Sequence, residues 1–288
     1  LARAITMIES TRPDHRMSAE ALIDQLQPHS GQSFRLGISG VPGVGKSTFI
    51  EALGLHIIER GHRVAVLTVD PSSPKSGGSI LGDKTRMETL SRHHNAFIRP
   101  SPSGGTLGGV ARRTHEVMGA TEAAGFDVIL VETVGVGQSE TAVVGLTDMF
   151  LLLLAPGAGD DLQGIKKGIV ELADLIAVNK ADGDLLAAAE RAKQDYSSAL
   201  HLLRPQSGAW QPRDMACSAM EGTGVADLWD AVLEFQELRT KSGQLLARRE
   251  EQAAEWMWEE ISEALLRGVR HHKATQSLVL QLERDVRA

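Results

Sequence analysis

The feature that most constrains the fold is the segment Gly40–Ser47, Gly-Val-Pro-Gly-Val-Gly-Lys-Ser, between a short apolar run and an amphipathic stretch. Two glycines that bracket four residues, followed by lysine and a hydroxyl residue at the start of a helix, are typical of a phosphate-binding loop, or P-loop. In such a loop, backbone N–H groups and the positive end of the helix dipole point at phosphate oxygens. The segment therefore predicts a nucleotide site between a strand and a helix.

Each residue type in this loop has a chemical reason to be there. We expect Lys46 to reach the β- and γ-phosphates as a catalytic residue, and Ser47 to supply a hydroxyl ligand to Mg²⁺. Thr48, which follows Ser47, is interpreted most simply as an ordinary helix position, although it is included among the residues predicted to bind nucleotide. The residues predicted to bind nucleotide here are Gly40, Val41, Pro42, Gly43, Val44, Gly45, Lys46, Ser47 and Thr48.

Short apolar runs alternate with longer amphipathic stretches from Phe34 onward, which predicts a parallel sheet with helices on both faces. We therefore expect a three-layer α/β P-loop domain over residues 31–224. A helical extension over residues 1–30, with Ser18 as an N-cap, and a helical region over residues 225–288 flank it. The predicted strands are Arg35–Ser39, Arg63–Asp70, Phe126–Glu132, Met149–Ala155 and Leu175–Asn179.

The tetrapeptide Asn179-Lys180-Ala181-Asp182 follows an apolar strand, where open α/β sheets bind ligands. The carboxylate of Asp182 can accept hydrogen bonds from guanine N1–H and the 2-amino group, whereas adenine has neither donor. We expect Asn179 to hold the nucleotide loops and the base edge, and the stem of Lys180 to cover the ring. Downstream, Ser218-Ala219 ends another short strand, and the Ala219 N–H is predicted to bind guanine O6.

Several acidic residues lie where a metal-assisted phosphoryl transfer would use them. Glu132 ends the strand Phe126–Glu132, and we expect it to be a metal-side, catalytic acid; Gly135 follows with an N–H for the γ-phosphate. Asp70 and Asp83 are further predicted metal ligands, and Asp83 is also a predicted catalytic residue. The alternative for both aspartates is a turn or helix-cap role.

Composition narrows the class of protein. Lysine and arginine total 30 against 37 acidic residues, a net charge of −7, which argues against binding nucleic acid through phosphate neutralisation. The longest apolar run, near Met149–Ala155, is far shorter than the ~20 residues that span a bilayer, so we expect no membrane association. The only cysteine, Cys217, has no disulfide partner within the chain, which favours a cytoplasmic setting.

The loops between these motifs carry a family resemblance. They are Val69-Asp70-Pro71-Ser72-Ser73, Gly82-Asp83-Lys84-Thr85-Arg86-Met87, Glu132 through Glu140 (Glu-Thr-Val-Gly-Val-Gly-Gln-Ser-Glu), and Pro156 through Lys166 (Pro-Gly-Ala-Gly-Asp-Asp-Leu-Gln-Gly-Ile-Lys). With the P-loop, they resemble the MeaB family, whose human counterpart is the methylmalonic aciduria type A protein. The resemblance covers essentially the whole chain.

This resemblance implies a homodimeric GTPase that serves an adenosylcobalamin-dependent mutase, most directly methylmalonyl-CoA mutase. GTP binding and hydrolysis would gate cofactor loading and protect the mutase from inactivation. By the same resemblance, Gln163 and Lys166 would lie in a loop that signals nucleotide state to the partner. For Lys166, the residue pattern by itself indicates only a solvated charge.

Three alternatives remain open from sequence. A transport-system kinase would need ATP preference, against Asn179–Asp182; a GTPase metallochaperone for nickel would need clustered histidine and cysteine ligands. A nucleotide-dependent binding module without useful hydrolysis is the third. The C-terminal helical pattern, with Trp256, Met257 and Trp258 on more than one side, fits either a second subunit or packing against the P-loop domain.

Overall fold

The computed structural model describes residues 1–10, 12–69, 87–100, 107–133, 139–156, 167–203, 209–271 and 273–287. Contacts within the chain group it into two compact units, Leu1–Leu246 and Ala247–Ala288. No helix among the described residues is both long and apolar enough to cross a bilayer. The first unit contains the sheet and the predicted P-loop.

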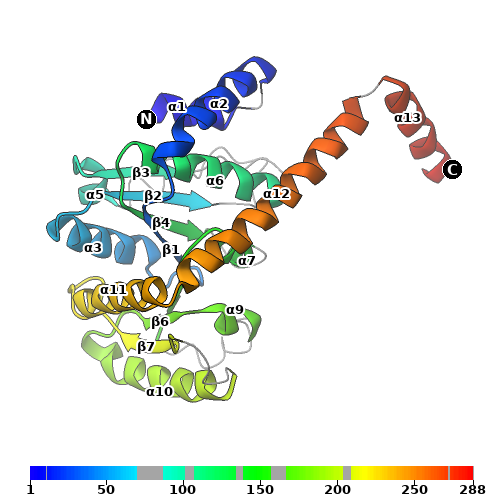
Figure 1. The fold of residues 1–288 in the computed structure, drawn as a ribbon. Helices are drawn as coiled ribbons and strands as arrows, with labels where there is room; N and C mark the ends of the chain where they lie inside the picture. Colours follow the sequence, from blue (N-terminus) through cyan, green and yellow to red (C-terminus); the bar gives the residue numbers. More distant parts are fainter. Residues whose placement is uncertain are drawn as a thin grey trace. The chain divides into compact units, whose positions relative to one another are not determined.

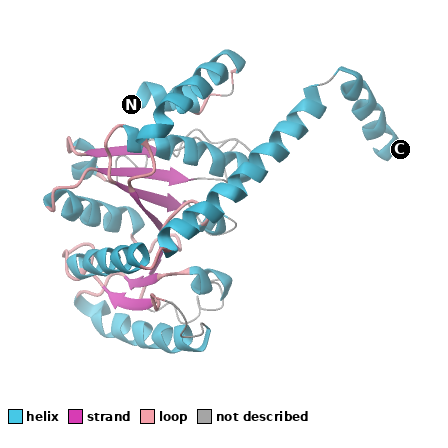
Figure 2. Ribbon diagram, in the orientation of Figure 1, coloured by secondary structure: helices cyan, strands magenta, loops and turns pink. Residues whose placement is uncertain are grey.

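A seven-stranded sheet forms the centre of the first unit, in the order β3-β2-β4-β1-β5-β6-β7 (Figures 1 and 2). Every neighbouring pair is parallel. The expected α/β fold with a parallel sheet and covering helices is confirmed. The strands are β1 (Phe34–Gly40), β2 (Val64–Val69), β3 (Ala96–Pro100), β4 (Val128–Thr133), β5 (Met149–Leu154), β6 (Leu175–Val178) and β7 (Arg213–Ala216).

Helices cover both faces of this sheet. On one face, α3 (Lys46–Glu59) and α11 (Val225–Lys241) pack against each other. On the other face, α7 (Ser139–Val144) lies beside β1, β4 and β5 and contacts α6 (Leu107–Ala123), which lies beside β2. Because α11 belongs to the first unit, the contacts group it with the sheet rather than with the helices that follow. The remaining elements of this unit are α1 (Ala2–Ile8), α2 (Pro13–Leu26), η1 (Gln27–His29), α5 (Glu88–Arg92), α9 (Lys167–Leu172), η2 (Gly183–Leu185) and α10 (Leu186–Leu203).

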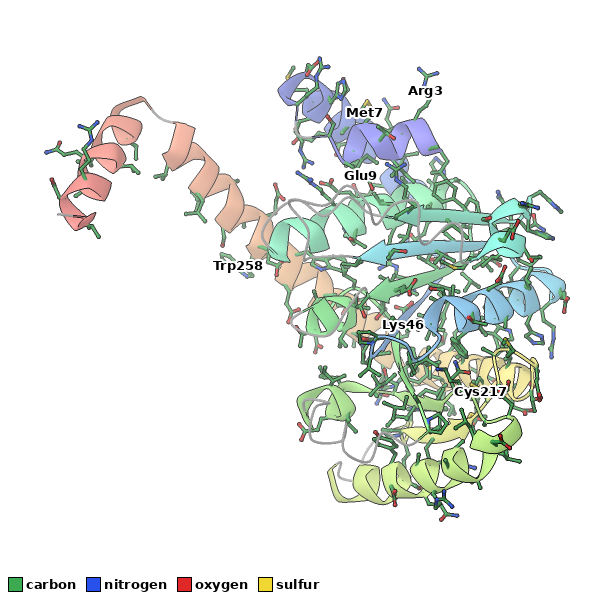
Figure 3. All side chains as sticks on the ribbon, turned by 180° about the vertical axis from the view of Figure 1, so that it is seen from behind. Arg3, Met7, Glu9, Lys46, Cys217 and Trp258 are labelled. Atoms are coloured by element: carbon green, nitrogen blue, oxygen red, sulfur yellow. The ribbon has the colours of Figure 1, made fainter. Side chains whose placement is uncertain are left out.

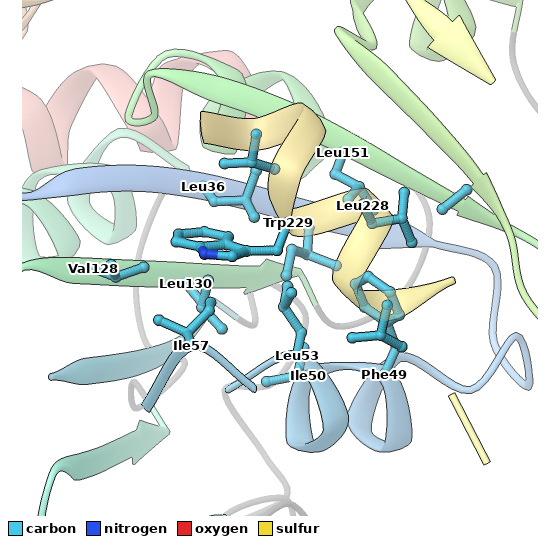
Figure 4. Close-up of a cluster of buried hydrophobic side chains, with 14 of the residues drawn as sticks. Leu36, Phe49, Ile50, Leu53, Ile57, Val128, Leu130, Leu151, Leu228 and Trp229 are labelled. Atoms are coloured by element: carbon cyan, nitrogen blue, oxygen red, sulfur yellow. The ribbon is translucent and has the colours of Figure 1, made fainter. Parts of the chain in front are cut away.

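The core lies between the sheet and the α3/α11 layer. Alternate residues of β1, Leu36 and Ile38, belong to one buried cluster with Leu53 of α3. Figure 4 shows Leu36 and Leu53 in this cluster with Trp229 of α11, which is 1% exposed. Residues two apart in a strand share a face, so the strand register decides which side chains meet these helices. The same alternation places Glu132, two residues after Leu130, toward α3.

Ion pairs connect the N-terminal segment to α6 and β3 within the first unit. Arg16 of α2 lies 2.9 Å from Glu116 of α6, and Glu9 pairs with Arg99 at the end of β3. The expected N-cap at Ser18 is wrong: Ser18 lies inside α2, and its hydroxyl donates to the Asp14 carbonyl at 3.3 Å. The helix begins at Pro13, whose fixed φ suits the first helical position.

A polar network lies under α6. Glu122 accepts hydrogen bonds from Ser33 Oγ at 2.5 Å and Arg35 Nε at 2.9 Å. His115 is close to this pair, and burial together with the Arg35 charge lowers the pKa of its imidazole to about 4, although Glu122 acts in the opposite direction. The imidazole is therefore neutral in the folded protein at neutral pH.

His115 should make the fold sensitive to acid. As pH falls from 6.5 towards 4, the unfolded chain binds a proton that the folded chain refuses, so stability is lost across this window, by about 3 kcal/mol at most. We expect His115→Gln to flatten the pH dependence of the free energy of unfolding between pH 6.5 and 4.5, measured by urea denaturation. An unchanged slope would contradict the assigned pKa.

The second unit consists of most of α12 (Gln244–His271) and of α13 (Lys273–Arg287). Both helices carry exposed apolar side chains three or four residues apart, which places them along one side of each helix. Trp258 is 62% exposed (Figure 3). The described exposed apolar residues are Met257, Trp258, Ile261, Leu265, Leu266 and Val269 in α12, and Leu278, Val279, Leu282 and Val286 in α13, here called the C-terminal apolar stripe.

Candidate nucleotide-binding site

The loop between β1 and α3 has the backbone that a phosphate cradle needs. Gly45 immediately precedes α3 with φ of 93°, a left-handed conformation that side chains disfavour. A Cβ on Gly40 would lie 2.4 Å from the Leu153 carbonyl oxygen, so only glycine fits beside β5. The loop follows β1, from which the strand order runs outward in both directions, and ligands bind at such switch points.

Lys46 and Ser47 occupy the first turn of α3, where the helix dipole is positive. Lys46 Nζ donates to the Gly40 carbonyl at 2.6 Å and contacts the Val41 carbonyl at 3.4 Å, so its ammonium lies over the loop (Figure 3). Ser47 is partly buried, and Thr48 is exposed. A cation and a hydroxyl thus stand at the helix end where the sequence predicts phosphate and Mg²⁺.

The predicted base-recognition motif touches this loop directly. Asn179 Nδ2 donates to the Val44 carbonyl at 2.9 Å, and Lys180 Nζ donates to the Gly43 carbonyl at 2.8 Å. Lys180 has a positive φ of 61°, an uncommon conformation that turns the chain sharply after β6. Two motifs that are 135 residues apart therefore form one continuous surface.

The second predicted base loop is bonded to the first. The Ser218 hydroxyl donates to the carboxylate of Asp182, and the Ala219 N–H donates to Asn179 Oδ1 at 3.0 Å. The Ala219 N–H, predicted to bind guanine O6, points at Asn179 in the structure, and its contact with the base stays a prediction. Asp182 itself is partly exposed.

Glu132 lies beside the P-loop strand. It is 3% exposed at the end of β4 and is in register with Ile38 of β1 and Thr68 of β2. On the opposite face, Thr133 Oγ1 donates to Ser39 Oγ at 2.8 Å. Glu132 and Ser47 are both oxygen donors on the α3 side of the sheet, which is the ligand chemistry that Mg²⁺ prefers, so the described residues fit this ion.

Known proteins are similar to this chain over most of its length. The sequence model of the family described as methylmalonyl Co-A mutase-associated GTPase MeaB matches residues 1–274. The chain belongs to the MeaB family. A probable GTPase of Mycobacterium tuberculosis is 55% identical over 288 residues, which cover 100% of this chain and 86% of that protein.

Two further relatives support the MeaB assignment. The mitochondrial methylmalonic aciduria type A homolog of Mus musculus is 50% identical over 296 residues, covering 99% of this chain and 71% of that protein. A solved structure of a LAO/AO transport system kinase superposes with a TM-score of 0.79 at 40% identity and covers 99% of this chain and 86% of that one. Membership in the family makes this chain a GTPase-family, nucleotide-binding protein.

Part of the predicted MeaB site lies outside the described residues. These positions are Asp70, Asp83, Gly135, Gln163 and Lys166. Within the described part of the chain, no three His, Cys, Asp or Glu side chains gather in a way that could hold a metal ion.

Cys217 is the site residue that sequence reasoning missed. Its thiol lies 3.7 Å from Asn179 Oδ1, and the residue is 1% exposed. The only available signal was its position directly before Ser218-Ala219, because a single cysteine has no spacing pattern.

Proposed function

We propose that this chain hydrolyses GTP and acts as a G-protein chaperone of an adenosylcobalamin-dependent acyl-CoA mutase, methylmalonyl-CoA mutase in the first instance. The observation that carries the nucleotide part is the direct bonding of Asn179 and Lys180 to the P-loop carbonyls of Val44 and Gly43. Family membership supports the mutase part. GTP binding and hydrolysis would gate cofactor loading and protect the mutase.

Phosphate binding would use the loop amides between Gly40 and Lys46 together with the ammonium of Lys46. Moving Lys46 Nζ from the Gly40 carbonyl to a phosphate oxygen exchanges a neutral acceptor for a charged one, which strengthens the hydrogen bond. Ser47 and Glu132 would hold Mg²⁺, which would supply positive charge to offset that of the phosphates. The residues named here would position and polarise the triphosphate for attack by water.

Base selection would come from the two bonded loops. Asp182, held on one side by Ser218, can accept from guanine N1–H and the 2-amino group. Asn179 uses one amide hydrogen for the Val44 carbonyl, and its second has no acceptor among the described residues, so it is free for an acceptor on the base edge. Adenine has neither donor, so it would leave the carboxylate oxygens of Asp182 with no partner on the base and only the Ser218 hydroxyl as a donor, which is costly for a charged group.

The mutase part has a direct test. We expect single-turnover GTP hydrolysis by the full chain to rise about tenfold or more when a methylmalonyl-CoA mutase is added, because partner binding completes sites of this kind. Bovine serum albumin at the same concentration is the control. No stimulation by any acyl-CoA mutase would refute the chaperone role while leaving GTP binding intact.

One rival function is that of a kinase, because a similar solved structure is named a LAO/AO transport system kinase. A kinase would transfer the γ-phosphoryl group of ATP to a protein acceptor. The carboxylate of Asp182 favours a guanine base instead, because adenine lacks the N1–H and 2-amino donors that it would accept from. Hydrolysis of GTP to GDP and free phosphate, together with no phosphorylated protein product from γ-labelled ATP, would decide against the kinase.

We also propose that the C-terminal apolar stripe binds a second copy of this chain. Leu265 is 66% exposed, and a two-fold interface would bury both copies of it. Leu265→Glu should therefore weaken dimerisation about 100-fold or more, since each leucine contributes roughly 1.5–3 kcal/mol.

Sedimentation velocity at micromolar concentration tests this interface. The matched control is Met17→Glu, which changes an equally exposed apolar side chain in α2. We expect a dimer for the wild type and for Met17→Glu, and a monomer for Leu265→Glu. A monomeric wild type would refute the dimer.

A further inference from the structure

Cys217 lies directly beneath the amide of Asn179. Its backbone N–H donates to the Val178 carbonyl at 2.9 Å, and its carbonyl accepts from the Ala181 N–H at 2.9 Å. The partners in these two hydrogen bonds, Val178 and Ala181, lie on either side of Asn179 in the sequence. The side chain adds a third link, from the thiol to Asn179 Oδ1 at 3.7 Å, which is within the range for a sulfur donor.

The bonding of Asn179 shows why a donor is needed at this place. Oδ1 accepts from the Ala219 N–H and from the Cys217 thiol, while Nδ2 donates to Val44 in the P-loop. An amide oxygen has two lone pairs, and these two donors fill them. A flipped amide would set Nδ2 against two donors and Oδ1 against a carbonyl, so the donors fix the orientation that reaches the P-loop.

The thiol is kept in its neutral, donating form. Burial raises the pKa of Cys217 to about 12, so the group carries its proton throughout the physiological range. Packing also restrains it: Gly224 has φ of 74°, and a Cβ there would come within 3.3 Å of the Cys217 Cβ. A thiolate at this position would repel Asn179 Oδ1 and lose the hydrogen bond.

We propose that Cys217 is a positioning residue for nucleotide binding, whose thiol holds the amide of Asn179 in the orientation that joins the base motif to the P-loop. This inference rests on the proposed guanine-nucleotide binding. The thiol acts through Asn179, and therefore on the retention of nucleotide, without contact with the base or the phosphates.

Two substitutions separate positioning from packing. Cys217→Ser keeps a donor, whereas Cys217→Val fills a similar volume with apolar atoms, and the backbone hydrogen bonds to Val178 and Ala181 persist in both. For a side chain that is 1% exposed, a purely structural role predicts that valine is tolerated at least as well as serine. A positioning role predicts that serine is tolerated better than valine, so that Cys217→Val releases nucleotide faster than Cys217→Ser.

The measurement is dissociation of a fluorescent N-methylanthraniloyl-GDP from the full chain, alongside thermal unfolding. We expect Cys217→Val to release it about threefold to fivefold faster, the value of one modest hydrogen bond, and Cys217→Ser to stay within about twofold of the wild type. The thermal midpoint of Cys217→Val should equal or exceed that of Cys217→Ser. A release rate for Cys217→Val equal to the wild type, or slower than for Cys217→Ser, would overturn the proposal.

A second probe locates the effect. Inosine diphosphate lacks the 2-amino group that Asp182 is expected to bind, and Cys217 acts through Asn179 instead. The ratio of GDP to inosine diphosphate affinity should therefore be the same in Cys217→Val and the wild type; a changed ratio would count against the route through Asn179. If the wild type bound no GDP analogue, the proposed guanine-nucleotide binding itself would fail. If all variants bound and released the analogue equally, only the role of Cys217 would fail.

Discussion

Lys46→Ala is expected to weaken GTP binding about 100-fold and to reduce hydrolysis below detection, because charge-assisted hydrogen bonds to phosphate contribute roughly 3 kcal/mol. The ammonium lies 2.6 Å from the Gly40 carbonyl, at the mouth of the loop. Its removal loses the contacts with the Gly40 and Val41 carbonyls, while the Asn179 hydrogen bond to Val44 does not involve Lys46. Isothermal titration with GTP and a phosphate-release assay measure the two effects.

The matched control for this change is Lys193→Ala, a surface lysine in α10 that lies 3.7 Å from Glu190. A surface pair of this kind contributes little, so this variant should bind GTP as the wild type does. Lys46→Ala with normal GTP affinity would remove the basis for the phosphate site. Thermal unfolding of both variants checks that the fold is intact.

Asp182→Asn should exchange the base preference from guanine to xanthine. Xanthine has N1–H as a donor but a carbonyl oxygen at position 2, so an amide can accept from the first and donate to the second. The carboxylate of Asp182 suits guanine for the corresponding reason. We expect GTP affinity to fall about 100-fold and XTP affinity to rise by a similar factor, since a site built around specific hydrogen bonds rejects a mismatched partner strongly.

The control for the base exchange is Asp184→Asn, the same change at an exposed position in η2, two residues along the chain. Fluorescent nucleotide displacement by GTP and by XTP gives both affinities in one experiment. The same ratio of GTP to XTP affinity in the wild type and in Asp182→Asn would show that Asp182 does not recognise the base. The Ser218 hydroxyl, which now donates to this carboxylate, can instead accept from the amide.

The strands buried on both faces could be predicted from sequence closely. The run Arg35–Ser39 became β1, Phe34–Gly40, because a strand covered by helices on both sides is apolar almost throughout. The strand β3, Ala96–Pro100, was missed, because it lies at the sheet edge and ends in Arg99 and Pro100. An edge strand is covered less fully, so its sequence carries less of the apolar signal.

The helix ends show which local rules hold. Glycine is common directly after a helix C-cap, and Gly61, which follows the C-cap Arg60 of α3, has φ of 94°, with its N–H donating to the Ile58 carbonyl at 2.9 Å. The predicted N-cap at Ser18 is wrong because α2 begins five residues earlier, at Pro13. Proline at the first position outweighed a serine that suits several helical positions.

For the site, sequence identified the motifs but not how they join. Nothing in the spacing of Asn179 and Val44 predicts their hydrogen bond, since it depends on β6 lying on the far side of β5 from β1. The thiol of Cys217 was missed for the same reason: its partner is set by the β6 and β7 pairing. The roles assigned to Glu132, Ser218 and the P-loop residues stay predictions that the geometry accommodates.

Competition between GTP and ATP for the bound fluorescent GDP analogue, in the presence of Mg²⁺, tests the central claim most directly. The bonded surface of P-loop, Asn179 and Asp182 predicts that GTP displaces the analogue at concentrations roughly 100-fold or more below those of ATP. Equal displacement by the two nucleotides would contradict the account, because the site would then bind phosphate without reading the base.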